Sequence, residues 1–188
     1  MAEVLVGGGQ LYYGPTAERD KRVVIATAKA LYSKVGNSVC IVTGGMPGIP
    51  MDFATTWLSI GGKHVEFIFS EEARSSLTAL DIVEGAKYTV VAQTQKERRQ
   101  LLTRRPNLKC AFFVQGGQYT TDEILKCIER GLPTVCFVGS GGACSGALPY
   151  DGKRLDPSAF PQWMHNDDPD ADPNELGELF AAEIEAML

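Results

Sequence analysis

Short apolar runs alternate along the chain with longer stretches in which apolar residues recur at helical spacing. The runs are rich in Val, Ile and Phe and most of them stop at glycine, which is typical of strands buried on both faces. They predict strands over Glu3–Gly7, Val39–Thr43, Val65–Phe69, Tyr88–Ala92, Cys110–Val114 and Thr134–Val138. The stretches between them predict helices over Thr16–Val35, Met51–Ile60, Gln95–Thr103 and Thr121–Arg130.

This alternation predicts an α/β fold. Strands that alternate with helices are the pattern of βαβ units around a parallel sheet. Right-handed crossovers between such units favour a Rossmann-like, doubly wound order with a mostly parallel sheet of about six strands. We therefore expect residues 1–188 to form a single Rossmann-like domain.

The last part of the chain predicts a loop and then a helix. Residues 145–172 are rich in proline and aspartate and are expected to have little regular structure. Asp172, Pro173 and Glu175 combine a helix N-cap, a first-turn proline and a third-position glutamate, so residues 173–188 are expected to be helical. Their apolar stripe should dock on the sheet or on a partner chain, and it consists of Leu176, Leu179, Phe180, Ile184, Met187 and Leu188.

Composition narrows the class of protein. Hydrophobic residues make up 44% and charged residues 22% of 188 residues, which is typical of a globular domain. No apolar run reaches the length of a membrane span, and the first ten residues lack the basic region of a secretory signal. The net charge of −5 argues against nucleic-acid binding through a basic face. With only His64 and His165 present, mechanisms that need several histidines are nearly excluded.

The cysteines indicate a reducing compartment. Their number is odd and no C-x-x-C pair occurs, so neither a disulfide framework nor a structural zinc site is expected. We therefore expect a cytoplasmic protein without a metal. The five residues are Cys40, Cys110, Cys127, Cys136 and Cys144.

Four of the predicted strands run into glycine-rich turns. In a doubly wound sheet the carboxyl ends of the strands bind ligands, and glycine lets backbone N–H groups approach a phosphate at a helix N-terminus. Each glycine has the alternative role of shaping its turn. No G-x-x-x-x-G-K-[ST] or G-x-G-x-x-G motif is present. Together the turns predict a phosphate-bearing ligand, with candidate contacts from Gly8, Gly9, Gly44, Gly45, Gly116, Gly117, Thr120 and Gly141.

Three segments carry a resemblance to a known family. The stretch Gln115-Gly116-Gly117-Gln118-Tyr119-Thr120-Thr121-Asp122-Glu123 resembles the P-G-G-x-G-T-x-x-E signature of the LOG family, the "lysine decarboxylase-like" proteins of the SLOG superfamily. Lys96-Glu97-Arg98-Arg99 resembles that family's H-E-R-K stretch, and residues 44–51 resemble its other glycine turn. Residues 138–142 look more like the wider superfamily, which includes molybdenum-cofactor carriers and nucleotide-sensing domains.

The sequence departs from the family pattern at three positions. Gln115 stands where the family has proline, Tyr119 where it has its third glycine, and Lys96 where it has histidine. If position 119 requires a positive φ angle, a tyrosine there predicts a different path for the loop.

The resemblance implies an enzyme that hydrolyses the N-glycosidic bond of a nucleoside 5′-monophosphate to free base and ribose 5-phosphate. It implies that Arg98 and Glu123 are the catalytic pair, that the ligand is a small nucleotide, that the chain forms a homodimer, and that no metal or redox cofactor takes part. The alternative function is a non-catalytic carrier of a nucleotide or molybdenum cofactor that uses the same pocket.

Both catalytic candidates also have a purely structural interpretation. Thr120 and Glu123 match a capping box, in which Thr120 is the N-cap of a helix and Glu123 its third residue. Arg98 belongs to a run of charged residues that is compatible with a solvated helix face.

Overall fold

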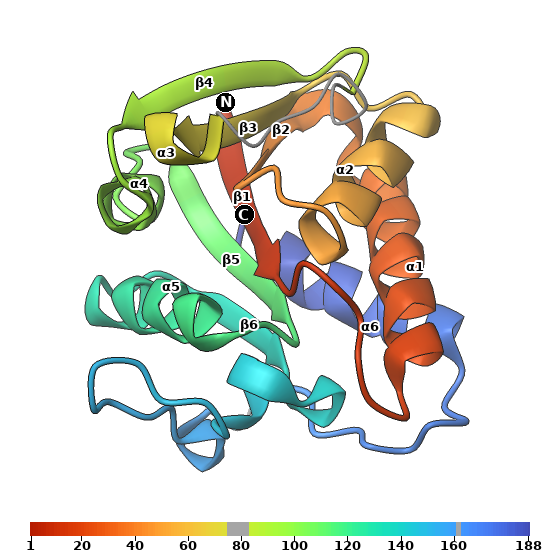
Figure 1. Cartoon of the computed structure of the whole chain (residues 1–188). Helices are drawn as coiled ribbons and strands as arrows, with labels where there is room; N and C mark the ends of the chain where they lie inside the picture. Colours follow the sequence, from red (N-terminus) through yellow and green to blue (C-terminus); the bar gives the residue numbers. More distant parts are fainter. Residues whose placement is uncertain (75–82, 161–162) are drawn as a thin grey trace.

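A six-stranded, fully parallel sheet forms the centre of the molecule (Figure 1). The structure is a computed structural model and describes residues 1–74, 83–160 and 163–188. The strands are β1 (Ala2–Gly8), β2 (Val39–Thr43), β3 (Val65–Ser70), β4 (Lys87–Ala92), β5 (Leu108–Val114) and β6 (Thr134–Phe137). The helices are α1 (Ala17–Val35), α2 (Ile49–Ser59), α3 (Glu71–Arg74), α4 (Gln95–Leu102), α5 (Gln118–Glu129) and α6 (Pro173–Ala186).

The predicted α/β class is confirmed, and each predicted strand and helix is present with bounds that move by a few residues. Short 3-10 helices occur at Gly36–Ser38, Val138–Ser140, Gly142–Ser145 and Pro157–Ala159. In the part of the chain that the structure describes, no helix combines the length and the apolar character needed to cross a membrane.

The strand order reverses beside the first strand. The order across the sheet is β4-β3-β2-β1-β5-β6, so the chain moves outward from β1 to β4 and then returns to β5 on the other side of β1. Ligands of doubly wound folds bind in the crevice at such a reversal, outside the carboxyl ends of the strands. The fold therefore places the ends of β1 and β5 at the expected position of a ligand.

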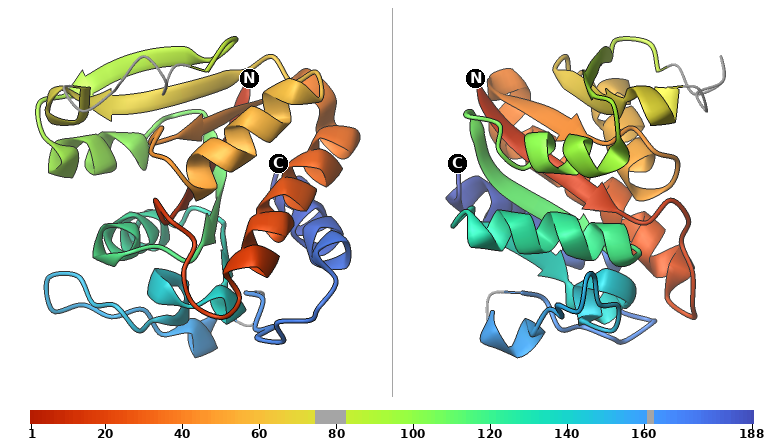
Figure 2. Two further views of the ribbon diagram at one scale, coloured as in Figure 1. Left: turned by 45° about the vertical axis from the view of Figure 1, so that its right-hand side comes forward. Right: turned by 60° about the vertical axis from the view of Figure 1, so that its left-hand side comes forward.

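Helices cover both faces of the sheet. Helices α1, α2 and α6 lie on one face, and α4 and α5 lie on the other (Figures 1 and 2). Successive residues of a strand point to opposite faces, so Val4 and Val6 of β1 join the α1 side of the core while Leu5 joins the α5 side. This double covering explains why the strands are continuous apolar runs.

The C-terminal helix docks on the sheet and on α1. Asp172 caps it, since its carboxylate accepts a hydrogen bond of 2.8 Å from the backbone N–H of Asn174. Phe180 lies 5.0 Å from the ring of Phe112 and 5.2 Å from that of Phe137, measured between centroids. A Cβ atom at Gly177 would lie 2.6 Å from Ala26 of α1, so glycine permits the close approach of the two helices.

The expected apolar stripe of residues 173–188 is wrong at two positions. Leu179 is 53% exposed and Leu188 is 38% exposed, whereas Leu176, Phe180 and Ile184 are buried. The buried face includes Gly177, and a residue two positions further along a helix is turned by about 200° from it. Leu179 therefore points away from α1 and the sheet.

The segment after β6 has little regular structure but is anchored in the core. Trp163 is 2% exposed, and its indole N–H donates a hydrogen bond of 2.8 Å to the carbonyl oxygen of Thr134. Met164 pairs with Phe137 at the end of β6 as an isolated bridge. The chain therefore reaches α6 along the β6 edge of the sheet.

Replacing Phe180 with alanine is predicted to lower the free energy of unfolding by about 3–5 kcal/mol, because it removes a buried ring that the sheet cannot refill. Leu179→Ala, one position earlier and exposed, is the matched control and should change it by less than about 0.5 kcal/mol. Urea denaturation of both variants measures the difference. Equal losses would contradict the docking of α6 on the sheet.

Candidate functional site

A cavity of about 480 Å³ opens at the carboxyl ends of β1 and β2, between these strand ends and helices α4 and α5. Its volume lies within the roughly 300–1,000 Å³ that small-molecule sites usually have. The candidates from the sequence that lie in its wall are Gly8, Gly9, Gly44, Arg98, Gly117, Thr120 and Glu123. A wider groove of about 670 Å³ between β4 and α4 contains none of the candidates.

Arg98 and Glu123 form a buried ion pair in the wall of this cavity. The Nη2 atom of Arg98 lies 2.8 Å from Oε1 of Glu123, and the two side chains are 9% and 10% exposed. Arg98 comes from α4 and Glu123 from α5, so the pair joins the two helices on this face of the sheet. The two residues assigned by resemblance are therefore in direct contact.

The guanidinium of Arg98 is only partly satisfied. Its Nε and Nη1 atoms are buried and have no hydrogen-bond partner among the described residues. A Cβ atom at position 44 would lie 2.5 Å from Nη1, so glycine at the end of β2 leaves the space that the guanidinium occupies. Unmade hydrogen bonds of a buried charged group are costly, and such groups are expected to find a partner. Arg98, which lines the cavity, therefore keeps unused hydrogen-bond donors at a fixed positive charge.

The capping-box interpretation of Thr120 and Glu123 is wrong. Helix α5 begins at Gln118 with Gly117 as its N-cap, so Thr120 is its third residue and Glu123 lies in its second turn. The hydroxyl of Thr120 instead lies 3.4 Å from the carbonyl oxygen of Gly8. The helix starts early because Gly116, at a φ of +95°, turns the chain directly after β5. Glu123 is thereby free to bind Arg98.

A complete capping box occurs on α4. Thr94 is its N-cap and accepts a hydrogen bond of 3.2 Å from the backbone N–H of Glu97, whose carboxylate lies 3.3 Å from the N–H of Thr94. The charged run that begins at Lys96 is not a uniformly solvated face. Lys96 and Glu97 are exposed, whereas Arg98 and Arg99 are 7% and 3% exposed and face α5.

A second ion pair lies beside the first. The Nε atom of Arg99 lies 2.7 Å from Oδ2 of Asp122, which also binds Lys126. Burial alone lowers the pKa of Arg99, but its hydrogen bonds to Asp122 and to the hydroxyl of Tyr150 raise that pKa above its ordinary value. Arg99 therefore keeps its charge, and its guanidinium lies 4.5 Å from the ring centroid of Tyr119.

Three glycine candidates do not line the cavity. A Cβ atom at Gly45 would meet the ring of Phe69, so this glycine shapes the turn after β2. Gly116 faces the side chain of Thr120, and its carbonyl oxygen accepts hydrogen bonds from the Tyr13 hydroxyl and the Ala143 N–H. Gly141 connects the two 3-10 helices after β6. The contacts of these three glycines therefore support a role in shaping turns and not the predicted role in binding a ligand.

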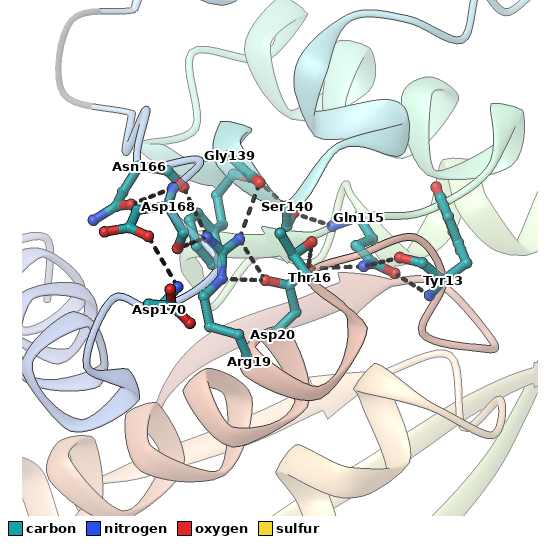
Figure 3. A network of polar contacts seen from close by, with 11 residues as sticks. Tyr13, Thr16, Arg19, Asp20, Gln115, Gly139, Ser140, Asn166, Asp168 and Asp170 are labelled. Carbon is teal, nitrogen blue, oxygen red and sulfur yellow. Dashed lines mark hydrogen bonds and ion pairs between the residues drawn. The ribbon is translucent and has the colours of Figure 1, made fainter.

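Gln115 ties the N-terminal loop to the end of β5 (Figure 3). Its amide Nε2 donates hydrogen bonds to the Asp20 carboxylate at 2.8 Å and to the Tyr13 carbonyl oxygen at 3.0 Å, and its Oε1 accepts one from the Tyr13 N–H at 3.3 Å. Its own N–H donates to the Ser140 hydroxyl at 2.8 Å. The side chain of Gln115 therefore uses its amide N–H groups and its oxygen to hold residues 13–20.

The positive φ angles of this loop lie at Gln115 and Gly116, with values of 52° and 95°. Tyr119 is in the first turn of α5 and is 57% exposed. The loop therefore changes direction before Tyr119, and the tyrosine needs no unusual backbone.

Arg19 anchors the opposite side of the same network (Figure 3). It is 5% exposed and binds the Asp20 carboxylate through Nε and Nη2, at 3.0 and 2.7 Å. Its remaining N–H groups donate to the carbonyl oxygens of Gly139 and Asp168, at 3.0 and 2.5 Å. Arg19 and Asp20 were missed by the sequence analysis because nothing in the start of a charged helix marks which residues turn inward.

The described residues give little support to metal or thiol chemistry. Among residues 1–74, 83–160 and 163–188, no three His, Cys, Asp or Glu side chains gather where they would hold a metal ion. The five cysteines are free. Burial raises the pKa of Cys110 to about 12, so its thiolate is scarce at neutral pH.

Comparison with known proteins yields a shared fold. No protein-family model matches the chain, and no curated protein matches it. The X-ray structure of TM1055, a structural-genomics target, superposes with a TM-score of 0.58 at 23% sequence identity. The match covers 83% of this chain and 86% of that one. This likeness supports the Rossmann-like fold and carries no statement about activity.

Gln115→Ala is predicted to lower the free energy of unfolding by about 2–4 kcal/mol, because it leaves buried polar groups of the N-terminal loop without partners. The exposed Gln118→Ala, three residues later, is the control and should stay within about 0.5 kcal/mol of the wild type. Urea denaturation measures both. Equal stability of the two variants would show that the Gln115 contacts contribute nothing.

Phosphate or AMP is predicted to raise the melting temperature, because the partly satisfied guanidinium and the glycine turns favour an oxyanion. At a ligand concentration 100 times Kd the stabilisation should be about 2.7 kcal/mol. Sodium chloride at matched ionic strength is the control. The absence of any shift with millimolar phosphate or AMP would refute the phosphate site.

Proposed function

We propose that the chain hydrolyses the N-glycosidic bond of a nucleoside 5′-monophosphate and releases the free base and ribose 5-phosphate. The observation that carries the proposal is the buried Arg98–Glu123 pair in the cavity wall, in which Nε and Nη1 of the guanidinium have no partner among the described residues and Nη1 lies next to Gly44. These are the two residues to which the resemblance to the LOG family assigns catalysis.

The phosphate end of the substrate is expected at the start of α5. The first N–H groups of a helix have no partner within the helix, and the helix dipole favours an anion there. Gly8, Gly9 and Gly117 in the cavity wall give an oxyanion room to approach the backbone. The hydroxyl of Thr120 lies in the same part of the wall.

Glu123 is expected to act on the ribose. Departure of the base builds positive charge on the sugar, and a fixed carboxylate stabilises that charge. Oε1 of Glu123 binds Arg98, which leaves Oε2 for the substrate and for the attacking water. The water oxygen forms the new bond to C1′, the C1′–N bond breaks, and the proton of the water passes to the departing base.

Arg98 is expected to hold the carboxylate of Glu123 in its orientation through the 2.8 Å contact between Nη2 and Oε1. Its unpartnered Nε and Nη1 atoms are the donors that remain for an oxygen or nitrogen of the bound nucleotide. Arg98 thus links the carboxylate to the ligand.

One observation favours a second candidate function, a carrier of a nucleotide or molybdenum cofactor. The charge of Glu123 is already balanced by Arg98, and a neutral pair is compatible with binding that leads to no reaction. Tight binding of a nucleotide that is never cleaved would support the carrier.

The remaining proposals rest on the resemblance and on the cysteine content. We propose a homodimer and a cytoplasmic location. Sedimentation of the purified chain at a mass twice 20.3 kDa would support the dimer.

Glu123→Gln is predicted to reduce the kcat of base release by about 10²–10³-fold, because glutamine keeps the shape and loses the charge. Its melting temperature is expected to fall, because the buried guanidinium of Arg98 loses its counter-ion, so the rates are compared at a temperature where the variant is folded. Glu129→Gln makes the same substitution on the exposed side of α5 and should leave kcat unchanged. Chromatography of the free base released from a panel of nucleoside monophosphates gives the rates. An equally active Glu123→Gln would remove Glu123 from the chemistry.

A further inference from the structure

Tyr119 is an aromatic side chain in the cavity wall that the proposed reaction leaves without a role. It is 57% exposed, and it lines the same cavity as Arg98 and Glu123. It stands at the second position of α5. An exposed ring at a cavity that also holds a buried ion pair is a candidate contact for a flat ligand.

The ring is held in place without a ligand. The guanidinium of Arg99 lies 4.5 Å from its centroid, and the ring of Tyr150 meets it edge-on at 6.1 Å. Arg99 is itself fixed by its ion pair with Asp122 and by a hydrogen bond of 3.3 Å to the hydroxyl of Tyr150. Arg99 occupies one face of the ring, so a flat ligand stacked on Tyr119 would take the opposite face.

Tyr119 and Glu123 share one face of α5. Residues four positions apart on a helix are neighbours, with Cβ atoms roughly 5–6 Å apart. Their partners on α4 are neighbours too, because Arg99 contacts Tyr119 and Arg98 binds Glu123. The cavity therefore presents an aromatic ring directly beside the carboxylate that is proposed to act on the ribose.

The electrostatic character of the Tyr119 ring favours contact with the base of a nucleotide over contact with its phosphate. The face of an aromatic ring carries negative potential, which disfavours a phosphate and suits another π system in offset stacking. The base of a nucleotide is joined to C1′, the atom at which the glycosidic bond breaks. A base on Tyr119 therefore places that bond next to Glu123, with the phosphate toward the glycine turns.

We propose that Tyr119 is a specificity-determining residue that stacks on the heterocyclic base, and that Arg99 is the positioning residue that holds its ring. A two-ring base offers more area for stacking on this ring than a pyrimidine does, so the contribution of Tyr119 should be larger for AMP than for CMP. The inference rests on the proposed function for the identity of the ligand as a nucleotide.

The test compares ligands with and without a base. Calorimetry on the full-length Glu123→Gln protein, which holds substrate without turning it over, gives Kd for AMP, CMP and ribose 5-phosphate. The double variant Glu123→Gln with Tyr119→Ala is expected to bind AMP with a Kd about tenfold higher than Glu123→Gln alone, in line with the contribution of one base stacked on an aromatic side chain. Kd for ribose 5-phosphate should not change, the preference for AMP over CMP should shrink, and Tyr119→Phe should keep the affinity for AMP.

The control is Leu101→Ala, which trims a side chain on α4 that is 47% exposed and lies outside this cavity. It should leave all three constants unchanged. An unchanged Kd for AMP in Tyr119→Ala would overturn the proposal. An equal loss for AMP and ribose 5-phosphate would also overturn it, because the ring would then act on the phosphate end or on the fold.

Base release from AMP by the wild type, measured on the same preparation, separates this inference from the proposed function. Selective loss of AMP binding in Tyr119→Ala without any base release by the wild type refutes hydrolysis and leaves the stacking platform standing. Base release together with no selective loss refutes the platform alone. A wild type that binds neither AMP nor ribose 5-phosphate refutes both.

Discussion

A buried guanidinium is costly unless its charge and its N–H groups find partners, and this constraint organises the structure around the cavity. Arg19 of α1 finds its partners in backbone carbonyl oxygens of the segment after β6. Arg99 of α4 finds its partner in Asp122 of α5. Arg98 pairs with Glu123, but its Nε and Nη1 atoms have no hydrogen-bond partner among the described residues. Arg98 and Arg99 both line the cavity and join the two helices beside it, and Arg98 is the one whose hydrogen bonds remain incomplete.

The fold could be predicted from the sequence because the strands other than β4 are largely buried on both faces. Val39–Thr43 is apolar up to its last residue, and its predicted and observed bounds coincide. The pairing of Arg98 with Glu123 followed from resemblance, since 25 positions separate them in the chain. The start of α5 was mispredicted because Thr120 and Glu123 match a capping box by spacing alone. The backbone turn at Gly116, which decides where the helix begins, is set by contacts with Thr120 and Ala143.

Contacts between segments that are far apart in the sequence could not be predicted from local residue patterns. Gln115 binds Asp20 across 95 positions, and Arg19 binds Asp168 across 149. Polar residues that turn inward look like any others in a charged stretch until the partner is known. The same limit applies to the glycines, because one that shapes a turn and one that lines a cavity have the same local sequence.

The packing of α6 against α1 joins two segments that are far apart in the sequence. Phe112 and Phe137 of the sheet are covered by Phe180, which a ribosome adds only after both strands have been made. Contacts of such long sequence separation form slowly, and exposed apolar strands are prone to aggregation meanwhile. A nascent chain therefore carries an open sheet face until α6 has been made. A chain interrupted before α6 would keep this face exposed to other chains, although every residue that lines the cavity would already be present.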